Sequence, residues 1–221
     1  ASAALLAACG NVSTTNTSAA GSTVGETFKI GYNLELSGAV SSYGQTEENG
    51  ANLAVKEINA AGGIDGKKIE VITKDNKSET AEAATVATSL ASEGANVVIG
   101  PATSGASAAS IPALTSAGVP MISPSGTQTN LVENDKGEVQ EYFFRTTFTD
   151  GYQGEIMAKY ATENFSAKKV VLYFDNSSDY GKGVAEAFKK AYTGEIVSEI
   201  TFASGDKDFQ AALTKLKDKE F

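Results

Sequence analysis

The sequence predicts an α/β fold in which parallel sheets form two doubly wound units. From residue 28 to the end, strand-like and helix-like segments alternate, as is typical of parallel strands joined by right-handed crossovers. The run from Asn96 to Gly100 is almost wholly apolar, which indicates a strand that is covered on both faces. The pattern restarts near Arg145, so we expect two units in series. No strand follows the last helix before Phe221, and the second unit is therefore expected to be incomplete in this chain.

The first unit is expected to contain four strands and three helices. Short apolar or alternating segments predict the strands at residues 28–34, 69–73, 96–100 and 119–123. Helical periodicity predicts the helices at residues 45–61, 78–93 and 104–117. Ala51, Ala54, Val55 and Ile58 share one face of the first helix. Ser78 is the expected N-cap of the second helix, and Pro112 is expected to kink the third.

The second unit follows a polar stretch at residues 127–141 and a strand-like segment at residues 142–147. Asp150 and Gln153 have the spacing of a capping box, which predicts the start of a helix. The remaining expected elements are strands at residues 170–174 and 195–202, a helix at residues 183–192 and a last helix that opens at Asp208.

Composition excludes several classes of function. The 221 residues carry 18 Lys and Arg against 27 Asp and Glu, a formal net charge of −9. Nucleic-acid partners favour an excess of Lys and Arg, so none is expected. The chain has no histidine, which removes Ser-His-Asp and Cys-His nucleophile activation and the commonest zinc ligand. We therefore expect a protein that is not an enzyme and that uses no cofactor or metal.

The single cysteine stands near the start of the chain, in the run Leu5-Leu6-Ala7-Ala8-Cys9-Gly10. This run resembles the lipobox of bacterial lipoprotein signals, which implies that residues 1–8 are a signal-peptide remnant and that Cys9 carries a lipid anchor. The polar residues that follow predict a flexible tether over residues 9–27. A buried structural cysteine is the alternative.

A ligand site is expected where strands of the first unit run into helices, because ligands of open α/β sheets bind beyond the carboxyl ends of the strands. Ser104 opens a helix, where backbone N–H groups and a hydroxyl suit a single carboxylate. Ser125 and Thr127 offer carbonyl and hydroxyl acceptors for an ammonium group, and Tyr43 and Tyr180 offer walls from opposite units. Together they predict a site for a zwitterion with an apolar tail.

Each of these residues also has a purely structural interpretation. Ser104 is interpreted equally well as a plain helix N-cap and as a ligand contact, and Ser125 with Gly126 is a common turn sequence. Asp150 is better interpreted as a helix cap than as a ligand group, and either tyrosine can serve packing alone. Their placement on facing loops is what favours a shared site.

From Phe28 to Phe221 the chain resembles the branched-chain amino-acid binding proteins of ABC importers, which have the type I periplasmic binding protein fold. The most specific motif is the run Asn59-Ala60-Ala61-Gly62-Gly63-Ile64-Asp65-Gly66. The other motifs that carry the resemblance are at residues 37–38, 43–44, 54–58, 98–104, 119–125, 145–147 and 179–181.

The resemblance implies a role for each residue of the predicted site. Ser104, helped by the Thr127 N–H, would bind the ligand carboxylate, while the Ser125 carbonyl and the Thr127 hydroxyl would bind the ammonium group. Tyr43 and Tyr180 would line the side-chain pocket, with Ala102 and Thr103 nearby. Further contacts that the family uses would lie beyond Phe221.

The resemblance also implies an organisation and a setting. Residues 28–144 would form the N-terminal lobe and residues 145–221 a hinge and part of the C-terminal lobe, and the two lobes would close about residues 145–149. The protein would be a monomer, anchored by lipid on the extracytoplasmic face of the cell membrane, that delivers a branched-chain amino acid to an ABC permease. The alternatives are a surface sensor with the same fold, or a receptor for a related small ligand such as another amino acid or a small amide.

Overall fold

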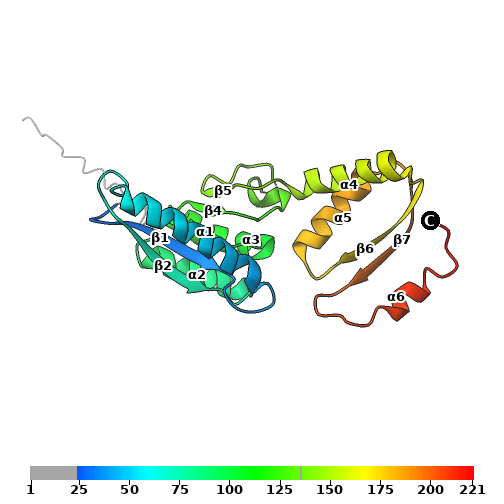
Figure 1. Ribbon diagram of the computed structural model, residues 1–221, viewed down its shortest axis with the longest axis horizontal. Helices are drawn as coiled ribbons and strands as arrows, with labels where there is room; N and C mark the ends of the chain where they lie inside the picture. Colours follow the sequence, from blue (N-terminus) through cyan, green and yellow to red (C-terminus); the bar gives the residue numbers. More distant parts are fainter. Residues whose placement is uncertain (1–23, 135) are drawn as a thin grey trace, which may run out of the picture.

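The computed structural model describes residues 24–134 and 136–221, and its strands form two separate sheets (Figure 1). The predicted signal remnant, Cys9 and most of the predicted tether lie outside the described residues. In the described part, no helix is both long enough and apolar enough to span a bilayer.

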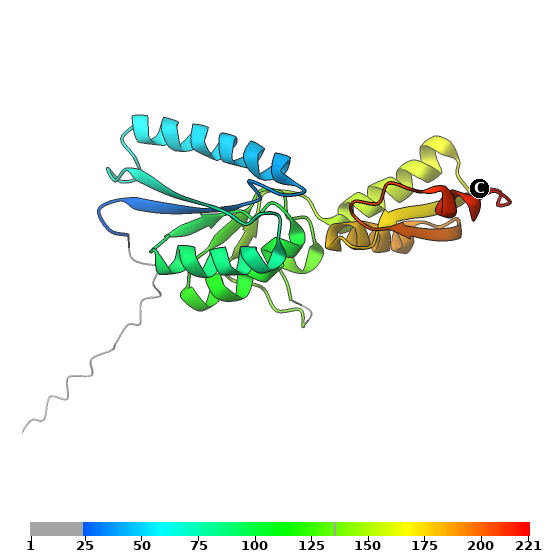
Figure 2. The ribbon, with the colours of Figure 1, turned by 90° about the horizontal axis from the view of Figure 1, so that it is seen from below.

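The first sheet has five parallel strands in the order β2-β1-β3-β4-β5. Their bounds are β1 Phe28–Leu34, β2 Ile69–Asp75, β3 Val97–Ile99, β4 Met121–Ser123 and β5 Phe143–Arg145. Helix α1 (Ser41–Ala60) covers one face, and α2 (Thr80–Ser92) and α3 (Ser104–Ala117) cover the other (Figure 2). This arrangement confirms the predicted doubly wound unit, with one difference: β5, from the strand-like segment at residues 142–147, joins the four predicted strands as a fifth. The strand order reverses between β1 and β3, which is the position where such sheets bind ligands.

The core of this unit lies between the sheet and the pair α2 and α3. Its buried apolar residues include Val86, Leu90, Val98, Ile111, Leu114, Val119, Met121 and Phe143. β3 and β4 contribute to this core, in agreement with their almost wholly apolar sequences. A short 3₁₀ helix, η1 (Thr129–Leu131), adds Leu131 to the cluster.

The second unit contains two parallel strands, β6 (Lys169–Asp175) and β7 (Glu195–Phe202). Helices α4 (Asp150–Phe165) and α5 (Asp179–Ala191) pack together on one side of these strands, and the short α6 (Gln210–Thr214) lies on the other (Figures 1 and 2). Residues 146–149 join β5 of the first sheet to α4. A small core of Ala158, Phe188 and Tyr192 holds α4 against α5.

Two of the predicted helix caps are wrong. Ser78 has a positive φ of 62° and stands outside α2, whose N-cap is Glu79. Asp150 does not cap α4 either. The N-cap is Thr149, whose hydroxyl accepts the Tyr152 N–H at 3.2 Å, while Asp150 is buried in the first turn.

The ends of three helices also differ from the prediction. α1 begins at Ser41 and α5 at Asp179, each four residues earlier than expected, so both Tyr43 and Tyr180 belong to first turns. α6 is only five residues long. α3 matches its predicted bounds and continues on both sides of Pro112.

Candidate ligand-binding cleft

A cleft of about 500 Å³ lies between the carboxyl ends of the first sheet and the start of α5. Its volume is within the usual range for a small-molecule site. All seven residues predicted from the sequence to contact ligand line it: Tyr43, Ala102, Thr103, Ser104, Ser125, Thr127 and Tyr180. The structure thus brings them together, and their roles toward a ligand stay predictions.

Glu35 builds the wall of the cleft on the β3 side. It follows β1, is fully buried, and its carboxylate reaches across to the loop after β3. Oε2 accepts the Ala102 N–H at 2.9 Å, and Oε1 accepts the Thr103 N–H at 3.1 Å and the Thr103 hydroxyl at 2.8 Å. Hydrogen bonds to an ionised group are about twice as strong as neutral ones. One side chain therefore fixes two of the predicted contact residues.

Two glycines permit this close approach. Gly44, in the first turn of α1, lies against the Glu35 backbone, and a Cβ there would be 2.3 Å from the Glu35 carbonyl oxygen. Gly100 has a φ of +92°, and a Cβ there would be 2.2 Å from the Asn33 carbonyl oxygen. Neither position has room for a larger residue.

Serine hydroxyls join the loop after β3 to the loop after β4. The Ser123 hydroxyl donates to the Pro101 carbonyl at 2.6 Å and accepts the Gly126 N–H at 2.9 Å. The Ser125 hydroxyl lies 2.9 Å from the Ala102 carbonyl oxygen. The residues that line the cleft on these two loops are consequently held as one unit.

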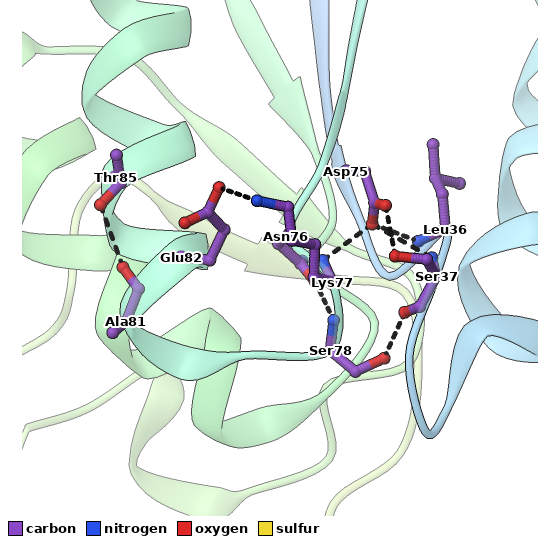
Figure 3. Close-up of polar contacts among 9 residues, drawn as sticks. All are labelled: Leu36, Ser37, Asp75, Asn76, Lys77, Ser78, Ala81, Glu82 and Thr85. Atoms are coloured by element: carbon purple, nitrogen blue, oxygen red, sulfur yellow. Dashed lines mark hydrogen bonds and ion pairs between the residues drawn. The ribbon is translucent and has the colours of Figure 1, made fainter.

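The loops after β1 and β2 form a second joined pair (Figure 3). Asp75 accepts the N–H groups of Leu36 and Ser37 at 3.0 and 3.1 Å and the Ser37 hydroxyl at 2.5 Å. The Ser78 hydroxyl donates to the Ser37 carbonyl at 2.7 Å, which explains why it is not a helix cap. Burial tends to raise the pKa of Asp75, but the bonds from Ser37, Lys77 and Leu36 together lower it below its ordinary value.

The donors predicted for a carboxylate are present at the start of α3. Ser104 is the first residue of that helix, after an N-cap at Thr103, so the interpretation of Ser104 as a plain cap is wrong. Its hydroxyl oxygen accepts the Gln128 N–H at 3.2 Å and keeps its own proton to donate. In the described part of the chain, the N–H groups of Ser104 and Thr127 donate to no protein acceptor. Both residues are buried and line the cleft, so two backbone donors and one hydroxyl are available to a ligand.

The two tyrosines stand on opposite walls, Tyr43 on α1 and Tyr180 on α5. They are 59% and 46% exposed, so neither is a core residue. The Tyr180 hydroxyl donates to Gln153 Oε1 at 3.1 Å, which orients the ring from α4. Both are therefore free to serve as walls for a ligand.

Several lining residues were missed by sequence reasoning. They are Ala39, Val40, Phe148, Gln153 and Asp179 among others. Asp179 lies inside a motif that signalled the family, but no signal marked its side chain. Phe148 is 54% exposed, and a large apolar residue in the segment that joins the two units was the one available hint.

Behind the cleft, Arg145 braces the loop that carries Thr127. Its guanidinium donates to the carbonyl groups of Gly126 at 3.3 Å, Gln128 at 2.7 Å and Thr129 at 3.3 Å. Asp150 is buried nearby, and neither carboxyl oxygen has a hydrogen-bond partner within normal geometry. Burial raises the pKa of Asp150, although the Thr127 hydroxyl and the Arg145 charge oppose the shift.

A second acid, Glu47 on α1, stands behind Ser125. Its Oε1 lies 2.5 Å from the Ser125 hydroxyl oxygen, and its Oε2 is buried without a partner. Burial raises the pKa of Glu47 to about 7, against a lowering by the Ser125 bond and with a further raise from Glu35. No group of three or more acidic, His or Cys side chains in the described residues is arranged to hold a metal ion.

Comparisons with known proteins agree on one family. The family model described as periplasmic binding protein matches residues 27–220. A Leu/Ile/Val-binding protein homologue from Brucella melitensis is 37% identical over 191 residues, which are 85% of this chain and 50% of that protein.

Solved structures give the same result. The crystal structure of the branched-chain amino acid transporter substrate-binding protein LivJ from Streptococcus pneumoniae, in complex with isoleucine, is 59% identical with a TM-score of 0.82. The match covers 88% of this chain and 55% of LivJ. A solute-binding protein of an ABC transporter from Rhodopseudomonas palustris, in complex with 3,4-dihydroxybenzoic acid, is 29% identical with a TM-score of 0.76, covering 88% of this chain and 52% of that one.

The chain spans about half the length of the curated relatives it matches. None of the relatives described above is named as an enzyme.

Proposed function

This chain belongs to the periplasmic binding protein family, and on that premise we propose that it is part of a receptor that binds a branched-chain amino acid between two lobes and delivers it to an ABC importer. The observation that carries the proposal is the cleft, where free N–H groups of Ser104 and Thr127 stand near the Ser125 carbonyl and the Thr127 hydroxyl. Donors for a carboxylate and acceptors for an ammonium group lie on one wall, which suits the backbone end of an amino acid.

The selectivity follows from the apolar part of the cleft's lining. Its apolar or aromatic lining includes Val40, Tyr43, Phe148 and Tyr180. Burying a Leu, Ile or Val side chain there stabilises the complex by about 1.5–3 kcal/mol, whereas an unpaired charge would oppose binding. Similarity to LivJ, whose structure holds isoleucine, supports the same ligand class.

The setting is part of the proposal. We infer a lipid anchor at Cys9, a tether over residues 9–27, and a monomer on the extracytoplasmic face of the membrane, where it would meet its permease. Lobe closure about residues 145–149 would trap the ligand. Treatment with a lipoprotein signal peptidase inhibitor should cause precursor to accumulate, and Cys9→Ala should release the protein from the membrane fraction.

A second ligand class has one observation in its favour. The relative from Rhodopseudomonas palustris holds an aromatic carboxylate, and the Ser104 and Thr127 donors would serve that carboxylate equally well. Such a ligand has no ammonium group to donate to the Ser125 carbonyl. The two classes therefore differ in their need for that wall of the cleft.

Calorimetric titration of the full-length protein with leucine, isoleucine, valine and 3,4-dihydroxybenzoate separates them. We expect micromolar or tighter binding of at least one of the three amino acids and none of the aromatic acid. Absence of binding to all three amino acids would contradict the proposed ligand class. Ser104→Ala should weaken amino-acid binding by about 10- to 150-fold, because one charge-assisted hydrogen bond is worth about 1.5–3 kcal/mol.

A further inference from the structure

The hydroxyl group of Ser125 has fewer protons than its neighbours require. The Ser125 oxygen lies 2.5 Å from Glu47 Oε1 and 2.9 Å from the Ala102 carbonyl oxygen. A carbonyl only accepts, an ionised carboxylate only accepts, and a hydroxyl has a single proton to donate. With Glu47 ionised, two acceptors would compete for one proton at these distances.

A proton on Glu47 resolves the conflict. The carboxyl O–H then donates to Ser125, and the Ser125 hydroxyl donates to the Ala102 carbonyl, so both contacts are complete hydrogen bonds. The result is a continuous chain from α1 through the loop after β4 to the loop after β3.

The surroundings of Glu47 also favour the neutral form. Glu35, at the end of β1, is the charged group that acts on it, and its negative charge opposes a second one. The loops after β3 and β4 present residues 100–105 and 123–127, none of which is ionisable. On α1, the neighbouring Glu48 adds another acid, whose charge acts on Tyr32.

The positive charge of Arg145 does not offset the negative charges of these acids around Glu47. Arg145 donates to carbonyl groups of the 126–129 segment, and its charge acts on Asp150. Among residues 24–134 and 136–221, no lysine or arginine forms an ion pair with Glu47. Burial and the Glu35 charge together raise the pKa of Glu47 to about 7, which agrees with the proton count at Ser125.

We propose that Glu47 is a positioning residue which, in its protonated form, holds the Ser125 and Ala102 walls of the cleft together, and that ligand affinity falls when this proton is lost. The predicted fall in ligand affinity rests on the proposed function. Glu47 does not itself line the cleft, so its effect passes through Ser125. The ionised carboxylate takes the Ser125 proton, because a charge-assisted hydrogen bond is the stronger one, and the Ala102 carbonyl loses its donor.

The test compares Glu47→Gln and Glu47→Ala with the wild type across pH 5.5–8.5. The Gln amide donates to Ser125 as the protonated acid does and does not titrate. Glu57→Gln is the matched control, because Glu57 is an exposed acid on the same helix. Leucine and isoleucine serve as probes in calorimetric titrations of the full-length protein.

We expect wild-type affinity to fall about tenfold from pH 6 to pH 8.5. Glu47→Gln should keep the low-pH affinity throughout, Glu47→Ala should bind weakly at every pH, and Glu57→Gln should follow the wild type. A wild-type affinity that is constant or rises with pH would overturn the proposal, as would an unchanged pH slope in Glu47→Gln.

A measurement without ligand separates this proposal from the proposed function. In the ¹³C spectrum of carboxyl-labelled protein, one Glu resonance should titrate near neutrality and be absent from Glu47→Gln. If it does so and no amino acid binds at any pH, the proposed function and the coupling to ligand fail while the proton assignment stands. If every Glu resonance titrates near its ordinary pKa, the proton assignment itself is refuted.

Discussion

Replacing Glu35 by glutamine should destabilise the protein although the two side chains have nearly the same shape. Glu35 is fully buried, and its two oxygens accept three hydrogen bonds from Ala102 and Thr103. A glutamine has one oxygen and one NH₂ group. If the oxygen keeps both bonds from Thr103, the NH₂ group faces the Ala102 N–H, and two donors oppose each other.

The cost follows from that mismatch. A buried donor left without a partner costs about 1–3 kcal/mol, and the two remaining bonds lose their charge assistance. The smaller desolvation cost of a neutral side chain offsets part of this loss. We therefore expect Glu35→Gln to lower the free energy of unfolding by about 2 kcal/mol and Glu35→Ala, which loses all three bonds, by about 3–5 kcal/mol.

Urea unfolding followed by far-UV circular dichroism measures the effect, since the chain has no tryptophan to report by fluorescence. With a slope of about 2 kcal/mol per molar urea, the Glu35→Gln midpoint should fall by about 1 M. Glu57→Gln removes the same charge from an exposed turn of α1 and should stay within about 0.5 kcal/mol of the wild type. Equal midpoints for Glu35→Gln and Glu57→Gln would refute the reasoning.

Three further predictions concern other parts of the site. Gly100→Ala should lower the melting temperature, because φ is +92° and the new Cβ would lie 2.2 Å from the Asn33 carbonyl oxygen. Gly50→Ala is the control: it has open space on α1 and should stabilise the protein by about 0.5–1 kcal/mol. Similar thermal shifts for both variants would contradict this prediction. Arg145→Lys loses the guanidinium group that donates to three carbonyl groups. It should lower the free energy of unfolding in urea by about 1–3 kcal/mol and weaken leucine binding in calorimetry. Wild-type values in both measurements would show that these hydrogen bonds do not hold the loop. Burial raises the pKa of Asp150, so the folded state favours its neutral form and wild-type stability falls as pH rises above the ordinary Asp value. Thermal melts from pH 3.5 to 7.5 should show a smaller fall for Asp150→Asn, in which the contribution of Glu47 remains, and a curve parallel to that of the wild type would contradict the prediction.

The order of elements in the first unit was predictable because its strands are short apolar or alternating segments between turn residues. Part of the cleft's lining was also predictable, since the carboxyl ends of neighbouring parallel strands must meet at one edge of a sheet. That rule placed the loops containing Ser104 and Ser125 side by side without any knowledge of distances. The structure agrees, with the Ser125 hydroxyl 2.9 Å from the Ala102 carbonyl.

The buried face of α1 was predicted only in part. Ala51 and Val55 are half-buried as expected, but Ala54 is exposed and Ile58 is 39% exposed. The polar Asn59 is half-buried and exchanges two hydrogen bonds with the Ile69 backbone, at 2.9 and 2.7 Å. Periodicity counts apolar side chains and is insensitive to a polar residue that pairs with a strand backbone.

Glu35, Glu47 and Asp150 show the same limit for the site. Each is an acid whose role depends on partners 23 to 78 positions away in the sequence, such as Ala102, Ser125 or Thr127. Among 27 acidic residues, nothing in the local pattern distinguishes these three. Only folding brings each acid to the groups that define its role.

The serine hydroxyls that join the loops after β3 and β4 have a consequence for solution conditions. Ser123, Pro101 and Gly126 are linked by hydrogen bonds between neutral groups, and dissolved ions do not screen such bonds as they screen paired charges. The opposite wall begins with an exposed Lys182–Asp179 pair at 2.7 Å, which added salt does weaken. Rising ionic strength should therefore leave the hydrogen bonds between these two loops unchanged and weaken the ion pair in the first turn of α5, so that added salt would act mainly on the α5 side of the cleft.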